Sequence, residues 1–126
     1  MSNHVILYIT CKNNKEAILI SDKLISSKLI ACANIIKNVT SIFRWKKKLN
    51  KSKEVILLAK TSQKNVKRIE KTVKKLHSYD IPCILFLEIK HGNKEFLKWR
   101  DPYPENMSEE IAEDLHEVMK SESKDD

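Results

Sequence analysis

The sequence predicts an α+β domain with one hydrophobic core, built in the order strand, helix, strand, strand, helix, strand. Three observations support this prediction. The 126 residues and 14.7 kDa suit a single domain. Four apolar runs have strand character, and two segments repeat their apolar residues every three or four positions, as amphipathic helices do. Only a basic segment separates the two middle runs, which predicts a hairpin.

The first strand and the first helix are predicted from the N-terminal 28 residues. Residues 4–11 form a compact run rich in β-branched side chains, which predicts a strand buried on both faces. A helix follows and ends near Lys28. Asn13 and Glu16 at its start have the spacing of a capping box.

The predicted hairpin pairs residues 29–45 with residues 54–61, and residues 46–53 form its solvated reversal. The 17 residues of the first strand, at roughly 3.3 Å each, extend to about 50 Å. A domain of this size is only about 35 Å across, so the hairpin must bend or project. Lys37-Asn38 suits a bend, because Asn tolerates a positive φ. A projecting apolar strand edge is usually covered by another chain, which predicts an oligomer.

The second half of the chain completes the fold. A second amphipathic helix is predicted over residues 62–76 with Ser62 as its N-cap, and a fourth strand over residues 83–90. A short helix or turn follows, then a terminal helix from Asn106 and a polar tail over residues 121–126. The order β-α-β-β-α-β over residues 1–120 is that of the ferredoxin-like fold, here with a long hairpin and an extra C-terminal helix.

Composition narrows the classes of function. The net charge of +7 favours anionic partners without identifying one. The sequence has no pattern of a secretory signal or a membrane span, so we expect a cytoplasmic protein. The three cysteines lie far apart, which argues against a disulfide framework and a structural zinc site. No phosphate loop, G-x-S-x-G or H-E-x-x-H motif is present, so an enzyme is not expected.

Five blocks occur in one order between about Val5 and Trp99: "LIACANII", "TSIFRW", "EVILLAKT", "LHSYDIP" and "GNKEFLKW". In this order and spacing they resemble the CutA family of divalent-cation tolerance proteins. The resemblance implies a ferredoxin-like subunit in a tight homotrimer whose long hairpins pair between neighbours. It also implies association with copper or another divalent cation, weakly bound.

The chain departs from the family pattern at three places. Lys37-Asn38 stands where relatives often have Pro-Gly, and Asn can adopt the conformation of the glycine. Lys47 stands where relatives usually have glycine, so the hairpin turn either takes strain or shifts toward Asn50. In the motif H-P-Y-x-x-P-E, here residues 77–83, Cys83 replaces the glutamate.

The order of elements places Cys11, His77 and Cys83 at one edge of the fold. Thiolates and an imidazole suit Cu(I) or zinc, so these three are the predicted metal ligands. Alternatively, each cysteine packs as a small hydrophobe, His77 only closes a helix, and Tyr79 hydrogen-bonds a turn. The resemblance adds cleft residues and trimer-interface residues. The cleft set is Tyr79, Pro82, Cys32 and Trp45, with a packing role as the alternative for Cys32, and the interface set is Ser41, Phe43, Arg44, Trp45 and Trp99.

The sequence is compatible with three functions: metal binding, small-ligand sensing and nucleic-acid binding. The leading hypothesis is a non-enzymatic, trimeric, metal-binding protein of the CutA type. The alternative is a small-ligand sensor analogous to PII signalling proteins, which bind an anion or nucleotide in their subunit clefts; this rests on fold analogy alone. Nucleic-acid binding through residues 44–53 is not expected, because no RNA-recognition signature accompanies the basic run.

Overall fold

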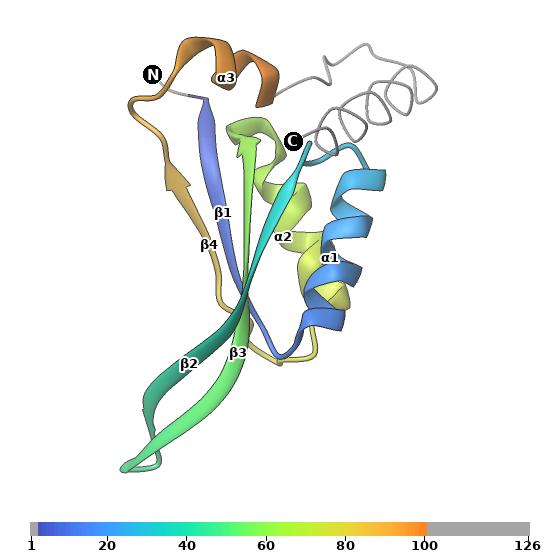
Figure 1. Cartoon of the computed structure of the whole chain (residues 1–126). Helices are drawn as coiled ribbons and strands as arrows, with labels where there is room; N and C mark the ends of the chain where they lie inside the picture. The colour runs from blue at the N-terminus through green and yellow to red at the C-terminus, as the bar shows by residue number, and fades with distance from the viewer. Residues whose placement is uncertain (1–2, 101–126) are drawn as a thin grey trace.

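The computed structural model describes residues 3–100 of the chain, with side chains described as far as residue 97. It is a single antiparallel sheet with two helices packed on one face (Figure 1). The elements are β1 (His4–Cys11), α1 (Asn14–Ser26), β2 (Ala33–Trp45), β3 (Lys48–Ser62), a 3-10 turn (Gln63–Asn65), α2 (Val66–Leu76), β4 (Ile84–Glu88) and α3 (Lys94–Arg100).

The strand order in the sheet is β2-β3-β1-β4, and every neighbouring pair is antiparallel. This confirms the predicted β-α-β-β-α-β order and the pairing of the two middle strands. β1 lies inside the sheet because both β3 and β4 pair with it. The short helix α3 follows β4 and falls within the predicted short helix or turn. The predicted terminal helix from Asn106 and the tail over residues 121–126 lie outside the described residues.

The two faces of the sheet differ in what covers them. Along β1 every second side chain, from Val5 to Cys11, is buried under α1 and α2. The prediction that β1 is buried on both faces is therefore wrong for the single chain, because the helices cover only one face. The uncovered face, here called the open face, is nonetheless apolar. Its described side chains include Ile6, Tyr8, Ile36, Ile56, Leu58, Leu85 and Leu87, which lie opposite one another across the strand pairs.

α1 begins and ends through local hydrogen bonds. The side chain of Asn13 accepts a hydrogen bond of 2.8 Å from the backbone N–H of Glu16, which confirms the predicted cap. At the other end Lys28 has a φ of 62°, and the N–H of Leu29 bonds to the carbonyl of Leu24 at 2.9 Å. This is a Schellman ending. Residues 29–31 then turn into the core instead of extending, so β2 begins at Ala33 and not at Leu29 as predicted.

The β2–β3 hairpin both bends and projects, where its length predicted at least one of the two. β1 pairs with β3 only as far as Val55, so the outer part of the hairpin pairs with itself alone and extends away from the sheet (Figure 1). The bend is a bulge: Ile36 pairs with Ile56, and the next pair is Val39 with Glu54. Asn38, inside the bulge, has a φ of 60°, which confirms the predicted bend at Lys37-Asn38.

The hairpin turn occupies only two residues. Lys46 and Lys47 have φ values of 51° and 66°, and Trp45 pairs with Lys48 across them. Positive φ at both central residues is the pattern of a type I′ turn, which normally contains Asn and Gly. The turn therefore takes the strain and does not shift toward Asn50. The predicted reversal over residues 46–53 is wrong, because residues 48–53 are already strand.

Two further boundaries differ from the prediction. Ser62 makes no side-chain cap bond, and α2 starts at Val66 after a 3-10 turn. Instead, Thr61 Oγ1 and Asn65 Nδ2 donate to the carbonyl of Leu29 at 2.7 and 3.2 Å, which ties this turn to the end of α1. β4 covers residues 84–88 instead of 83–90. Within residues 3–100, no helix has the length and apolar character needed to cross a membrane.

Candidate metal site

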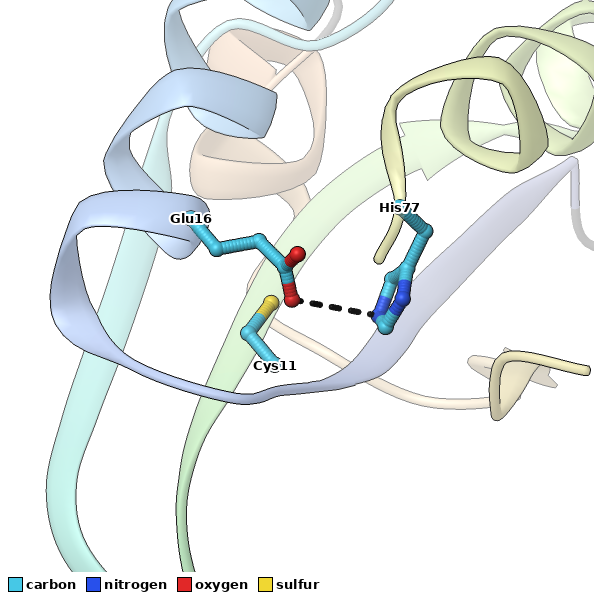
Figure 2. Close-up of side chains that lie close together, drawn as sticks. All are labelled: Cys11, Glu16 and His77. Atoms are coloured by element: carbon cyan, nitrogen blue, oxygen red, sulfur yellow. Dashed lines mark ion pairs between the residues drawn. The ribbon is translucent and has the colours of Figure 1, made fainter. Parts of the chain in front are cut away.

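Three buried side chains with metal-binding atoms meet where β1 ends, α1 begins and α2 ends (Figure 2). They are Cys11, Glu16 and His77. The thiol sulfur, one carboxylate oxygen and one ring nitrogen all lie within 4.8 Å of one another. Imidazole Nε2 is 3.7 Å from Glu16 Oε1. The arrangement places a soft donor, a borderline donor and a hard donor around one point.

Each of the three comes from a different element end. Cys11 is the last residue of β1 and, by the strand alternation, points to the side covered by the helices. Glu16 lies in the first turn of α1, where its own N–H is held by Asn13 and its side chain turns inward. His77 is the C-cap of α2, and its N–H bonds to the carbonyl of Val73 at 2.9 Å. The site therefore depends on the packing of α1 and α2 against β1.

The carboxylate of Glu16 is held by two backbone N–H groups. Oε1 accepts from Lys12 at 3.0 Å, and Oε2 accepts from Ser78 at 2.9 Å. Burial by itself raises the pKa of Glu16, but the hydrogen bonds from Ser78 and Lys12, together with the nearby His77, lower it below its ordinary value. Glu16 is therefore ionised at neutral pH and supplies a buried negative charge.

The imidazole of His77 has both nitrogens engaged. Nε2 lies 2.7 Å from the carbonyl oxygen of Thr10, which can only accept, so Nε2 carries the proton. Nδ1 accepts from the N–H of Tyr79 at 3.1 Å. These two bonds describe a neutral ring, and the 3.7 Å contact with Glu16 becomes an ion pair only when His77 is protonated.

Cys11 is fully buried beside two carboxylates. Burial, followed by the negative charges of Glu16 and Glu54, raises its pKa from 9.0 to about 12. It is therefore a protonated thiol at neutral pH, and a cation must displace that proton to bind the sulfur. The residue types fit copper or zinc, but each of the three side chains is already protonated or hydrogen-bonded. This fit allows weak binding.

Tyr79 stands beside this group. Its ring centroid is 4.9 Å from that of His77, and the planes are tilted by 55°. Its hydroxyl donates to Glu54 Oε2 at 2.8 Å. Burial, the hydrogen bond to Glu54 and the negative charges nearby raise the pKa of Tyr79 to about 12.

The third predicted ligand, Cys83, does not join Cys11 and His77 in the single chain. Its thiol is exposed, and only its carbonyl approaches the site, accepting from Thr10 N at 3.4 Å. The reason is strand alternation: Leu85 and Leu87 lie on the open face, and Cys83 precedes them at the same spacing of two. The structure brings Glu16 into the group in its place.

The other predicted site residues are not members of this group of three. Pro82 and Cys32 are half-buried; Pro82 precedes β4 and Cys32 precedes β2. The predicted interface residues Ser41, Phe43, Arg44 and Trp45 lie on the projecting part of the hairpin, where Trp45 is 62% exposed and Phe43 44%. Trp99 falls in α3, beyond the described side chains. Their roles in a cleft or an interface stay predictions.

The residues missed from the sequence are Glu16 and Glu54. Glu16 had a visible signal, the capping spacing from Asn13, but that signal predicts a surface role at a helix start. Glu54 was predicted only as the first residue of a strand. No spacing along the chain indicates that either carboxylate lies near Cys11, because the contacts of Glu16 with Ser78 and His77 and of Glu54 with Tyr79 form only in the folded chain.

Comparison with known families gives a direct match. The model of the CutA1 divalent ion tolerance protein family matches residues 5–102. The chain belongs to this family. Among curated CutA relatives, it is 39% identical over 92 residues to the Protein CutA homolog of Xenopus laevis, covering 73% of this chain and 61% of the relative. It is 38% identical over 98 residues to the divalent-cation tolerance protein CutA of Archaeoglobus fulgidus, covering 78% of this chain and 95% of the relative.

Solved CutA structures agree with the fold. The chain aligns with CutA1 from Oryza sativa at a TM-score of 0.77 and 30% identity, covering 82% of this chain and 95% of that chain. It aligns with CutA from Archaeoglobus fulgidus, which is described as a periplasmic divalent cation tolerance protein, at a TM-score of 0.74 and 38% identity, covering 78% and 95%. The chain spans about three-fifths of the length of the first curated vertebrate CutA relatives.

Proposed function

We propose that this CutA family chain acts in divalent-cation tolerance as a non-enzymatic homotrimer that binds copper or another divalent cation weakly. The observation that carries the proposal is the buried group of Cys11, Glu16 and His77, whose donor atoms lie within 4.8 Å of one another. Relatives that share the fold are named divalent-cation tolerance proteins. We keep the cytoplasm as the proposed location, because all three cysteines are free thiols and one of them, Cys83, is exposed, which is typical of reducing compartments.

The chemistry of the group explains why binding is weak. A cation that binds the sulfur must displace a proton held with a pKa of about 12. It must also compete with the carbonyl of Thr10 for His77 Nε2, or with two backbone N–H groups for Glu16. Binding therefore releases protons, and the affinity rises with pH. The protonated thiol is a poor nucleophile, which supports a binding role over a catalytic one.

The homotrimer is supported by apolar surface that the single chain leaves uncovered. Leu85 and Leu87 on the open face are 50% and 52% exposed. On the hairpin, the large apolar side chains Ile42, Phe43, Trp45 and Leu49 are all exposed. Large exposed apolar side chains of this kind, beside a long unpaired strand edge, are usually buried between copies. Light scattering during gel filtration is expected to give three times the 14.7 kDa chain mass, and a monomer would contradict the trimer.

The metal site is tested with Cu(I) held by a competing chromophoric chelator under reducing conditions. The exposed Cys83 and half-buried Cys32 are first removed in a C32S/C83S variant, so that only Cys11 offers a thiol. We expect this variant to extract Cu(I) from the chelator, and the triple variant C11A/C32S/C83S to extract about tenfold less or none. Equal extraction by the two variants would rule out Cys11. Extraction lost already on changing Cys32 and Cys83 would place the copper elsewhere.

A further inference from the structure

The charge of the chain is divided unevenly between two parts of the sequence. The first 100 residues contain 22 Lys and Arg against 7 Asp and Glu, a net +15. Residues 101–126 contain 2 Lys against 10 Asp and Glu, a net −8, and the two parts give the +7 of the whole chain. The CutA family match ends at residue 102, so almost all of this acidic segment follows the matched region.

The described structure presents a basic surface that complements this segment. α2 buries Ile69 and Val73 on one side, and the opposite side carries five exposed cations, here called the basic face. Its members are Lys67, Arg68, Lys71, Lys74 and Lys75. The single carboxylate of α2, Glu70, pairs with Lys74 at 3.0 Å, so the helix keeps a net charge of +4 over 11 residues.

The basic face lies on the side of the molecule away from the open face of the sheet, since α1 and α2 cover the opposite side (Figure 1). Burying the open face between copies therefore leaves the basic face accessible to solvent. Five clustered cations on one helix repel each other, and a neighbouring anionic group relieves that repulsion.

We propose that the acidic segment of residues 101–126 docks on the basic face of α2 in its own chain. The segment starts next to α3, and its 26 residues reach about 85 Å when extended, against a domain diameter of about 35 Å. A tethered segment also has an effective concentration in the millimolar range, which gives it an advantage over a free polyanion. By covering the basic face it limits non-specific association with nucleic acid or acidic lipid. The contact weakens with salt, because exposed charges are screened.

Hydrogen exchange measured by mass spectrometry on the full chain at low salt tests the docking. In K67E/K71E, backbone amides within residues 105–122 are expected to exchange about threefold faster or more than in the wild type. The control K46E/K48E makes the same charge change at the exposed hairpin turn and is expected to leave the segment unchanged. Adding E113K/E117K to K67E/K71E restores the opposite charges and is expected to restore the slow exchange.

Three results would overturn the proposal. Equal exchange in wild type and K67E/K71E shows that the basic face does not hold the segment. Equal acceleration in both double variants shows a general effect of net charge. Protection of α2 that arises only when heparin or acidic vesicles are added shows that an external polyanion occupies the face. All four substituted lysines are exposed, so circular dichroism is expected to show unchanged folding.

Discussion

The hydroxyl of Tyr79 donates a 2.8 Å hydrogen bond to Oε2 of Glu54 and thereby joins the segment after α2 to the base of the projecting hairpin. Glu54 lies just beyond the last β3 residue that pairs with β1, opposite Val39 and next to the bulge. The backbone N–H of Tyr79 also holds Nδ1 of His77. One residue therefore connects the hairpin to the buried group around Cys11.

Tyr79→Phe is expected to lower the free energy of unfolding by about 1 kcal/mol. A hydrogen bond to a charged acceptor contributes about 1.5–3 kcal/mol, and the partial exposure of both side chains reduces this value. Urea unfolding at pH 7 measures the change. Tyr8→Phe is the matched control, because Tyr8 lies on the open face. An equal loss in the two variants would show that the bond to Glu54 contributes nothing specific.

The raised pKa of Cys11 predicts a loss of stability in alkali. Because the folded-state pKa is about 12 and the ordinary value is 9.0, the protonated thiol is favoured by folding. The contribution of the protonated Cys11 thiol to the free energy of unfolding is complete below pH 9 and is lost as the pH rises toward 12. Urea midpoints measured from pH 8 to pH 11 with a reductant are expected to fall less steeply in Cys11→Ala than in the wild type. Parallel curves would contradict the prediction. The raised pKa of Tyr79 also lowers stability between pH 10 and 12. Both proteins are therefore compared again in a Tyr79→Phe background, where only Cys11 differs.

The three thiols are expected to react with iodoacetamide at very different rates at pH 8. Cys83 is exposed in the single chain and is expected to react first, the half-buried Cys32 reacts more slowly, and the fully buried Cys11 reacts only when the chain unfolds. Slow labelling of Cys83 in the native protein would show that the proposed contact between copies covers the start of β4. Peptide mass spectrometry with and without urea assigns each site. Rapid labelling of Cys11 in the native protein would contradict this order and would show that the buried group opens to solvent.

Glu16→Gln is expected to destabilise the protein by about 1–3 kcal/mol at pH 7. The amide nitrogen of Gln cannot accept from Lys12 or Ser78, so one buried N–H loses its partner. Folding lowers the pKa of Glu16. The ionised carboxylate therefore contributes to the free energy of unfolding above pH 4.5, and this contribution is lost as the pH falls. The difference in the free energy of unfolding between Glu16→Gln and the wild type, measured by urea unfolding, should therefore shrink toward pH 3. Glu70→Gln, which alters an exposed helix pair, is expected to cost under about 0.5 kcal/mol.

The features that the sequence predicted depend on local residue patterns, whereas those that it missed depend on tertiary packing. The strand β1 follows from a compact β-branched apolar run and the bulge at Asn38 from the tolerance of Asn for a positive φ, and both are found in the structure. The membership of the buried group depends on tertiary packing. Glu16 turns inward because α1 packs against the end of α2, and Cys83 turns away because of the parity of β4. The apolar pattern of the chain does not show which face of β4 the helices cover, and it does not show that α1 turns Glu16 toward α2.

The position of the hairpin turn is also set by tertiary structure and not by the local preference of its residues. The register of β3 is set by its pairing with β1 and by the bulge, so the reversal falls on Lys46-Lys47 although neither residue favours a positive φ. Replacing Lys47 by Gly removes strain of about 1–2 kcal/mol, while the added freedom of the unfolded chain costs about 0.5–1 kcal/mol.

Lys47→Gly is therefore expected to stabilise the protein by about 0.5–1 kcal/mol. This change should raise the melting temperature by a few degrees in calorimetry. Lys53→Gly is the control, because Lys53 is an exposed strand residue paired with Thr40, and glycine there is expected to lower the melting temperature. A lower melting temperature for Lys47→Gly would show that the lysine turn is unstrained or that Lys47 makes a stabilising contact in the assembled protein.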